Sequence, residues 1–314
     1  MKTFPAWLAA LSLTLLPAFA GQEQKGDESL ITKSERIVFL GDSITAACTY
    51  TSNFATWAEI RFPKHHVEWI NAGLSSETVS GLSEKGHAGG RFPRPDLHER
   101  LGRVLEQTKP DLVFACYGMN CGIQMPLDEE RFAKYREGIE WLKKEVEAAG
   151  AKIVFLTPPY YDEIRNPKKA YYTDVLAEYS KWLLGRRADG WNVIDVNGTM
   201  TSFIEEKRKT DPKFSLQPDA VHPNPAGHWL MAQGMIRWFG DEEAAKSESV
   251  KAMLEARGQP AGIAQLCHQR MTVLHDAWLT ATKHKRPGVR PGKPLPEANK
   301  IAAELTQRID SLKR

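Results

Sequence analysis

The chain has 314 residues, of which 42% are hydrophobic and 26% are charged, as is typical of a globular protein. This length suits one large α/β domain with an appendage. The formal net charge is only +3, and lysine and arginine are not concentrated in any dense run. Composition therefore excludes a strongly basic protein that binds nucleic acid or an anionic membrane surface, and it leaves the substrate open.

The first twenty residues have the pattern of a secretory signal peptide. Lys2 supplies a positive charge, residues 6–15 are apolar, and Ala18-Phe19-Ala20 places small residues at the two positions that signal peptidase inspects. The apolar stretch is too short to span a bilayer, and a buried N-terminal helix is the alternative. We expect cleavage after Ala20 and a secreted or periplasmic protein without stable membrane insertion.

Five short apolar runs follow, each rich in β-branched or aromatic residues and ending in turn residues, as strands buried on both faces do. They are residues 37–40, 67–70, 112–117, 153–156 and 193–196. Between and after them, apolar residues recur at helical spacing over residues 96–106, 130–148, 171–184 and 225–239. Alternating strands and helices predict a parallel sheet with right-handed crossovers. We therefore expect an α/β fold over residues 21–240, a flavodoxin-like three-layer α/β/α sandwich with a five-stranded parallel sheet.

Residues 241–314 have no strand pattern. Helical patterns cover residues 241–257, 261–282 and 297–312, and a basic Pro/Gly-rich segment at 284–294 must be irregular. This segment is either a solvated connector or a surface for an anionic ligand. We expect residues 241–314 to form a helical C-terminal extension packed on the sandwich.

The four cysteines are Cys48, Cys116, Cys121 and Cys267. Their spacing matches no zinc pattern, so we expect no metal. An even number permits disulfides in an exported protein, but the sequence does not fix their pairing. Cys48 and Cys121 are the candidate pair because both follow chemically important motifs, whereas Cys116 lies within a predicted strand and is expected to be a buried free thiol.

The first predicted strand runs directly into Gly41-Asp42-Ser43. A serine between a strand and a helix lies at the carboxyl edge of the sheet, where ligands bind in such folds. Its hydroxyl becomes a nucleophile when a neighbouring base removes the proton. Gly-Asp-Ser alone is a weak signal, and a helix N-cap is the alternative role for Ser43.

Asp219 and His222 supply an acid and a base three residues apart, in a loop restricted by proline on each side. In a catalytic triad, Asp219 would hold one imidazole nitrogen while the other takes the proton of Ser43. A surface histidine at a helix start is the alternative. His228, six residues further along, is expected to pack or hydrogen-bond within its helix.

Attack on an ester creates an oxyanion, which needs hydrogen-bond donors already in place. Asn71-Ala72-Gly73 follows the second predicted strand, and the absence of a side chain would let the Gly73 N–H approach a substrate closely. Gly118-Met119-Asn120 follows the third predicted strand, and the Asn120 amide can donate. Each is an ordinary turn on its own, but together with the serine and histidine motifs they indicate one site at one sheet edge.

These blocks resemble the signature blocks of the SGNH (GDSL-like) hydrolase superfamily, over residues 36–239. The resemblance implies a flavodoxin-like fold and ester hydrolysis without a cofactor. It implies that Ser43, Asp219 and His222 form the catalytic triad, and that Ser43, Gly73 and Asn120 form the oxyanion hole. The family's asparagine is often followed by aspartate, whereas a cysteine follows it here. The C-terminal extension lies outside the resemblance.

Candidate substrate contacts lie in the loops at the same edge. His87 and Arg91 belong to a glycine-rich stretch, and Tyr160 follows the fourth predicted strand, where it offers an aromatic platform for a sugar. An exposed connection and simple packing are the alternatives. The surrounding segments are mostly polar, which favours short acyl chains; they are residues 49–55, 75–94, 121–127 and 160–167.

We expect a secreted serine esterase that removes a short acyl group, acetyl above all, from a small-molecule or polysaccharide ester. A lipid or aryl esterase of the same fold is the alternative within the same class. A non-catalytic carbohydrate-binding protein is the alternative from a different class. The oligomeric state stays open.

Overall fold

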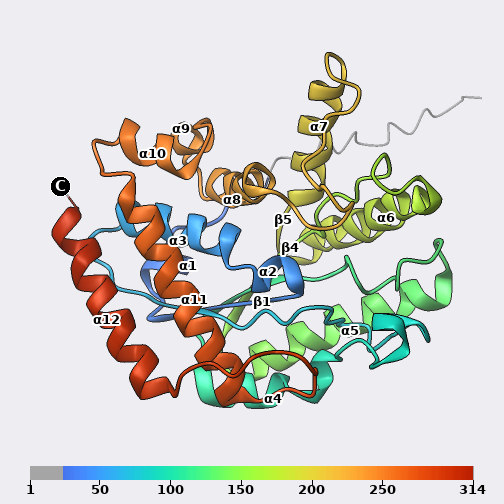
Figure 1. The fold of residues 1–314 in the computed structure, drawn as a ribbon, viewed down its shortest axis with the longest axis horizontal. Helices are drawn as coiled ribbons and strands as arrows, with labels where there is room; N and C mark the ends of the chain where they lie inside the picture. Colours follow the sequence, from blue (N-terminus) through green and yellow to red (C-terminus); the bar gives the residue numbers. More distant parts are fainter. Residues whose placement is uncertain (1–23, 314) are drawn as a thin grey trace, which may run out of the picture.

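The computed structural model describes residues 24–313 (Figure 1). The predicted signal peptide, residues 1–20, lies outside the described residues. Five parallel strands form a single sheet in the order β2-β1-β3-β4-β5. They are β1 (Arg36–Gly41), β2 (Glu68–Asn71), β3 (Leu112–Cys116), β4 (Lys152–Leu156) and β5 (Asn192–Ile194). The predicted five-stranded parallel sheet is confirmed.

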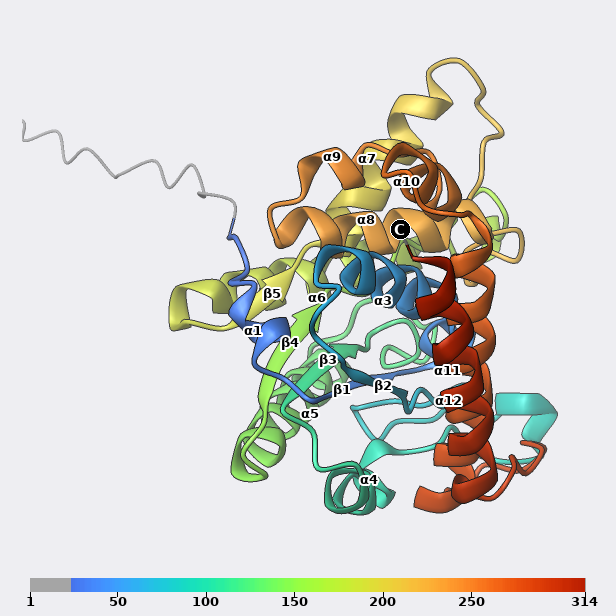
Figure 2. The same ribbon diagram turned by 90° about the vertical axis from the view of Figure 1, so that its left-hand side faces the viewer.

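Helices cover both faces of this sheet, as the predicted sandwich requires. In Figures 1 and 2, α3 and α8 lie on one side of the sheet and α4 and α5 on the other. The α-helices before the extension are α1 (Ser29–Thr32), α2 (Ser43–Ala46), α3 (Thr49–Arg61), α4 (Leu101–Thr108), α5 (Glu129–Ala148), α6 (Tyr171–Gly185), α7 (Val196–Arg208) and α8 (Pro225–Trp238). Short 3-10 turns occupy His87–Gly90, Leu97–Glu99, Pro167–Lys169 and Arg186–Asp189.

Aromatic side chains fill the layer between the sheet and α3. Phe39 and Phe114 stack on adjacent strands with ring centroids 5.4 Å apart, and Phe54 meets Phe114 edge-on at 5.3 Å. Trp57 packs beside them and donates from its buried indole N–H to Asp241 at 2.8 Å. This packing fixes α3 and the β1 end against one another, which is where the candidate nucleophile stands.

The extension consists of α9 (Glu242–Ala245), α10 (Val250–Ala256), α11 (Gly262–Thr282) and α12 (Leu295–Leu312). Figures 1 and 2 show α11 and α12 side by side along one flank of the molecule. Helix α11 lies against α3 and the edge strand β2, so it covers the open edge of the sheet. A buried ion pair between Arg270 of α11 and Glu59 of α3 joins the two parts. As predicted, the described extension contains no strand.

All four cysteines are buried free thiols, so the predicted Cys48–Cys121 disulfide is wrong. The Cys48 sulfur accepts the side-chain N–H of Asn71 at 3.4 Å. The Cys121 residue instead faces Ser80, whose hydroxyl donates to its carbonyl at 3.1 Å. The expectation of a buried free thiol at Cys116 is confirmed. Among the described residues, no helix combines the length and apolar character needed to cross a membrane.

Candidate active site

Ser43 stands where β1 ends and the short helix α2 begins. Asp42 is the N-cap of that helix, and its carboxylate accepts the Ile44 N–H at 3.0 Å. The Ser43 hydroxyl is therefore released from capping and donates to His222 Nε2 at 2.8 Å. The Ser43 N–H has no hydrogen-bond partner within residues 24–313, which leaves it available to a substrate.

Asp219 determines which nitrogen of His222 carries the proton. The His222 Nδ1–H donates to Asp219 Oδ2 at 2.7 Å, while Asp219 Oδ1 accepts the backbone N–H groups of Val221 and His222 at 3.0 and 2.7 Å. A carboxylate only accepts, so Nε2 is left as the acceptor that faces Ser43. Burial alone would raise the pKa of Asp219, but these hydrogen bonds outweigh it and hold the pKa below its usual value.

The loop that carries this acid and base is fixed at several points. Ala220 has a φ of 74°, a left-handed conformation that is uncommon for a residue with a side chain. Its carbonyl accepts the Asp162 N–H at 2.9 Å. Asn224 then caps α8 by accepting the Gly227 N–H at 2.9 Å, and Pro225 occupies the first helical turn. These contacts present the imidazole to the Ser43 hydroxyl in one orientation.

Gly73 follows β2 and packs directly on the helix that begins at Ser43. A Cβ atom at this position would lie 2.6 Å from the Ala46 nitrogen, so only glycine fits. The Gly73 N–H donates to Asn71 Oδ1 at 2.9 Å, and its carbonyl accepts from His275 Nε2 at 3.0 Å. The N–H that the sequence predicts as an oxyanion donor is thus already engaged within its own turn. Close packing is the contribution that the structure gives to Gly73.

Ser76, three residues further along, has a free N–H that sequence reasoning missed. The Glu77 N–H donates to the Leu74 carbonyl at 3.1 Å and closes a turn in which Ser76 has a φ of 69°. Glycine is the usual residue at such a position, so a serine there gives no sequence signal. In the described part of the chain the Ser76 N–H has no partner. Asn120 Nδ2 donates one N–H to the Glu77 carbonyl at 3.4 Å, directly beside this turn, and its second N–H has no partner among the described residues.

A model of the GDSL-like lipase/acylhydrolase family matches residues 39–230, more than half of the chain. The chain belongs to this family. It is a carboxylic ester hydrolase with the α/β fold of the SGNH hydrolases. The resemblance and the enzyme class expected from the sequence are confirmed.

Among curated proteins, the hydrolase is 23% identical to an acetylxylan esterase of Geobacillus stearothermophilus over 233 residues, which are 68% of this chain and 97% of that protein. A solved structure of a catalytic mutant of Axe2, an acetylxylan esterase of the same organism, has a TM-score of 0.51 at 21% identity, covering 66% of this chain and 94% of that chain. A gut microbial diltiazem-metabolizing enzyme has a TM-score of 0.54 at 21% identity over 70% of this chain. The hydrolase spans only 49% of that enzyme, about half its length. At 21% identity, these two solved structures show only that the fold is shared.

The residues predicted to contact the substrate are placed less favourably than Ser43, Asp219 and His222. His87 packs edge-on against Phe92, and its side chain is only 12% exposed. Arg91 is exposed but donates to the Ala88 carbonyl at 2.8 Å. Tyr160 is buried, and its hydroxyl is bound within its own neighbourhood by Glu163 and Arg208, so it presents no open platform for a sugar. In the described structure, none of the three has a hydrogen bond to Ser43, Asp219 or His222.

Two buried arginines, Arg94 and Arg100, lie behind the candidate oxyanion site, and neither belongs to a recognisable sequence motif. Arg100 and Glu77 form an ion pair with fully buried side chains, at 2.6 Å, and Tyr117 donates to the same carboxylate at 2.7 Å. Arg100 also donates to the Ala72 carbonyl at 2.7 Å, just before Gly73. Arg94 donates to Asn120 Oδ1 at 2.7 Å. These contacts with Glu77, Ala72 and Asn120 span 23 to 28 residues of sequence, so no local pattern predicts them.

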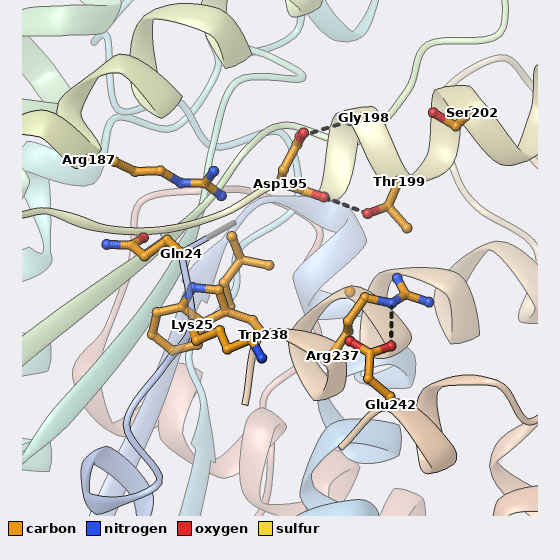
Figure 3. Close-up of a pocket in the computed structure, with 12 residues that line it drawn as sticks. Gln24, Lys25, Arg187, Asp195, Gly198, Thr199, Ser202, Arg237, Trp238 and Glu242 are labelled. Carbon is orange, nitrogen blue, oxygen red and sulfur yellow. Dashed lines mark hydrogen bonds and ion pairs between the residues drawn. The ribbon is translucent and has the colours of Figure 1, made fainter. Parts of the chain in front are cut away.

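A cavity of about 330 Å³ lies elsewhere on the hydrolase, between α7, α8 and the N-terminal segment (Figure 3). Asp195 and the Arg237–Glu242 ion pair line it. Neither Ser43 nor His222 belongs to its wall. The candidate active site is instead open at the surface, because the His222 side chain is 49% exposed.

Proposed function

We propose that this hydrolase is a serine esterase in which Ser43 attacks the ester carbonyl carbon. His222 takes the hydroxyl proton and returns it to the departing alcohol, while Asp219 holds the imidazole and stabilises its charged form. Water then attacks the acyl–Ser43 ester. His222 takes a proton from this water and returns it to the Ser43 oxygen as the carboxylic acid is released. The observation that carries the proposal is the continuous relay, with hydrogen bonds of 2.8 Å from Ser43 to His222 and 2.7 Å from His222 to Asp219.

The tetrahedral intermediate needs donors aimed at its oxyanion. The Ser43 N–H and the Asn120 side-chain amide are proposed for this role. A third donor comes from the turn after β2. Hydrogen bonding favours Ser76 for it, because its N–H is free whereas that of Gly73 is occupied by Asn71.

We propose an acetylated carbohydrate outside the cytoplasm as the substrate. Two observations support this choice: the similarity to an acetylxylan esterase across nearly the whole of that protein, and the signal-peptide pattern ending at Ala20. An open site at the surface also suits a substituent on a bulky polymer, because the polymer need not enter a cavity.

The proposal is tested by measuring acetate released from acetylated xylan by the wild type and by Ser43→Ala. We expect release by the wild type and none above background by the variant. Binding of the polymer without acetate release by the wild type would favour the carbohydrate-binding alternative. Release that persists in a folded Ser43→Ala variant would contradict the nucleophile assignment.

One observation favours a lipid or aryl esterase as a second candidate. Met125 and Leu127 are 45% and 49% exposed in the loop that follows Asn120, and Ile164 is 38% exposed. The loop that follows Asn120 is joined to the segment that follows Ile164, because Lys169 and Tyr171 both donate hydrogen bonds to Gln124. An apolar rim at this position would suit an aryl or longer acyl group, and the preference for acyl-chain length decides between the two candidates.

A further inference from the structure

Arg94 is a buried side chain whose three donor groups are all used. Its Nε and Nη2 donate to the two carboxylate oxygens of Glu84 at 2.6 and 2.8 Å, and its Nη1 donates to Asn120 Oδ1 at 2.7 Å. The residue is only 8% exposed, and Asn120 is 5% exposed. The bidentate ion pair with Glu84 thus fixes the plane of the guanidinium. The remaining nitrogen, Nη1, faces the amide of Asn120, a proposed oxyanion donor.

Backbone hydrogen bonds at the base of the loop between Thr78 and Leu97 hold Arg94 beside Asn120. The Thr78 N–H donates to the Pro95 carbonyl at 2.9 Å, and the Leu97 N–H donates to the Thr78 carbonyl at 3.0 Å, which together close the base of the loop. The Arg94 N–H also donates to the Ser83 hydroxyl at 2.8 Å. The position of Arg94 is therefore set by its backbone as well as by its charge.

The chemistry of the contact decides which way the Asn120 amide points. A guanidinium has donors only, so it can hydrogen-bond only to the oxygen end of the amide. The nitrogen end must then point away from Arg94, toward the Glu77 carbonyl and the turn formed by residues 74–77. A reversed amide would present an oxygen to the negatively charged intermediate and would repel it. A charged donor on the amide oxygen also polarises the group and strengthens its N–H as a donor.

We propose that Arg94, held by Glu84, is a positioning residue that fixes the orientation of the Asn120 amide and strengthens its donation to the oxyanion. The proposal rests on the proposed esterase function and goes beyond it. Arg94 touches neither the nucleophile nor the acyl group in this role. It acts only through Asn120, and this dependence separates it from a residue that merely stabilises the loop.

A double-mutant cycle on hydrolysis of p-nitrophenyl acetate tests this dependence. We expect Asn120→Ala to lower kcat by about 10²–10³-fold, and Arg94→Gln to lower it by roughly 10- to 100-fold with KM changed less than about twofold. In the Asn120→Ala background, Arg94→Gln should cost less than about threefold, because the amide it orients is gone. Losses that multiply in the double variant would overturn the proposal.

Arg270→Gln is the matched control, since Arg270 is also 8% exposed and also paired with a glutamate, but lies in α11. It should lower the melting temperature without a selective loss of kcat. If Arg94→Gln does not fold, Arg94→Lys and Glu84→Gln replace it in the same cycle, with smaller kcat losses that must again vanish when Asn120 is alanine. A folded variant of Arg94 with unchanged kcat would also overturn the proposal.

The two proposals fail in different ways. Activity that survives in Ser43→Ala contradicts the serine esterase assignment itself. If Ser43→Ala is inactive while the Arg94 and Asn120 effects are independent, the esterase assignment stands and only the role of Arg94 is lost.

Discussion

The His222 ring is oriented by one carboxylate that serves three donors. Both backbone N–H groups on Asp219 Oδ1 require an oxygen. In Asp219→Asn, that oxygen would stay with the backbone, and the new NH₂ group would face His222 Nδ1. The ring would then carry its proton on Nε2 and could not accept from Ser43.

We therefore expect Asp219→Asn to lower kcat by about 10²–10⁴-fold with KM little changed. Steady-state kinetics on p-nitrophenyl acetate measure the effect. Asp211→Asn is the matched control, because Asp211 is exposed and, among the described residues, its carboxylate accepts only the Lys213 N–H of its own turn. Equal activity in the two variants would show that Asp219 does not orient the ring.

Asp42 is a buried carboxylate next to Ser43, the proposed nucleophile. Burial raises its pKa from 3.8 to about 6, against the opposing effect of the Ile44 N–H. A carboxyl whose pKa is raised on folding binds its proton more tightly in the native state, so it favours folding below about pH 4 and loses that contribution as the pH rises through about 6. The charged form at neutral pH therefore costs stability, on the order of 1–3 kcal/mol.

In Asp42→Asn the side-chain oxygen still caps α2 but carries no charge. We expect the variant to gain stability over the wild type as the pH rises from about 4 to about 6, and to keep a constant advantage above that. Urea unfolding at a series of pH values measures the difference. A difference that does not change with pH would show that the Asp42 carboxyl does not titrate differently in the native state.

Single residues were predictable where the motif was local. Ser43, Asp219 and His222 were selected because each lies in a short motif at a loop or strand end, and the relay brings the three together. Ser76 and Arg94 were missed for physical reasons. A positive φ at a serine cannot be recognised from the sequence. Arg94 meets Asn120 across 26 residues of chain that include α4 and β3, so no local spacing links the two residues.

At the level of whole elements, the strands were predictable and some helices were not. Helix α3 is buried along most of its length, between the sheet, α8 and α11, so it lacks the alternation of polar and apolar faces that marks a surface helix. The predicted strand at 193–196 ends at Ile194 because Asp195 caps α7 by accepting the Gly198 N–H. The predicted helix at 241–257 is two helices, α9 and α10, because Ser249 caps a new start.

Helix α11 makes the extension part of the core of the hydrolase. Met271 is 2% exposed within the hydrophobic core. We expect Met271→Ala to lower the free energy of unfolding by about 2–5 kcal/mol and to shift a single unfolding transition as a whole. Gln265→Ala, on an exposed position of the same helix, is the control and should change little. Two separate transitions would instead make the extension an independent unit.

The hydrogen-bonded Ser43, His222 and Asp219 lie at an open surface of the molecule. This position affects which acyl-chain lengths the esterase should prefer. The segment at 49–55 that the sequence placed beside the site is part of α3, where Tyr50 and Phe54 are fully buried, so it forms no wall. We expect kcat/KM for p-nitrophenyl esters to be highest for acyl chains of two to four or so carbons and to fall with longer ones. A groove that buries each added methylene would instead raise kcat/KM by about fourfold per methylene. A steady rise to twelve or so carbons would support the lipid esterase candidate.

The central claim is that Ser43 is a nucleophile activated by His222. Labelling with a fluorophosphonate, followed by peptide mass spectrometry, tests it most directly, because such reagents form a stable bond to an activated serine. We expect one adduct, on Ser43, in the wild type, no adduct in Ser43→Ala, and labelling slowed by at least about 10²-fold in His222→Ala. An adduct on another serine, or labelling of Ser43 at an unchanged rate without His222, would contradict the claim.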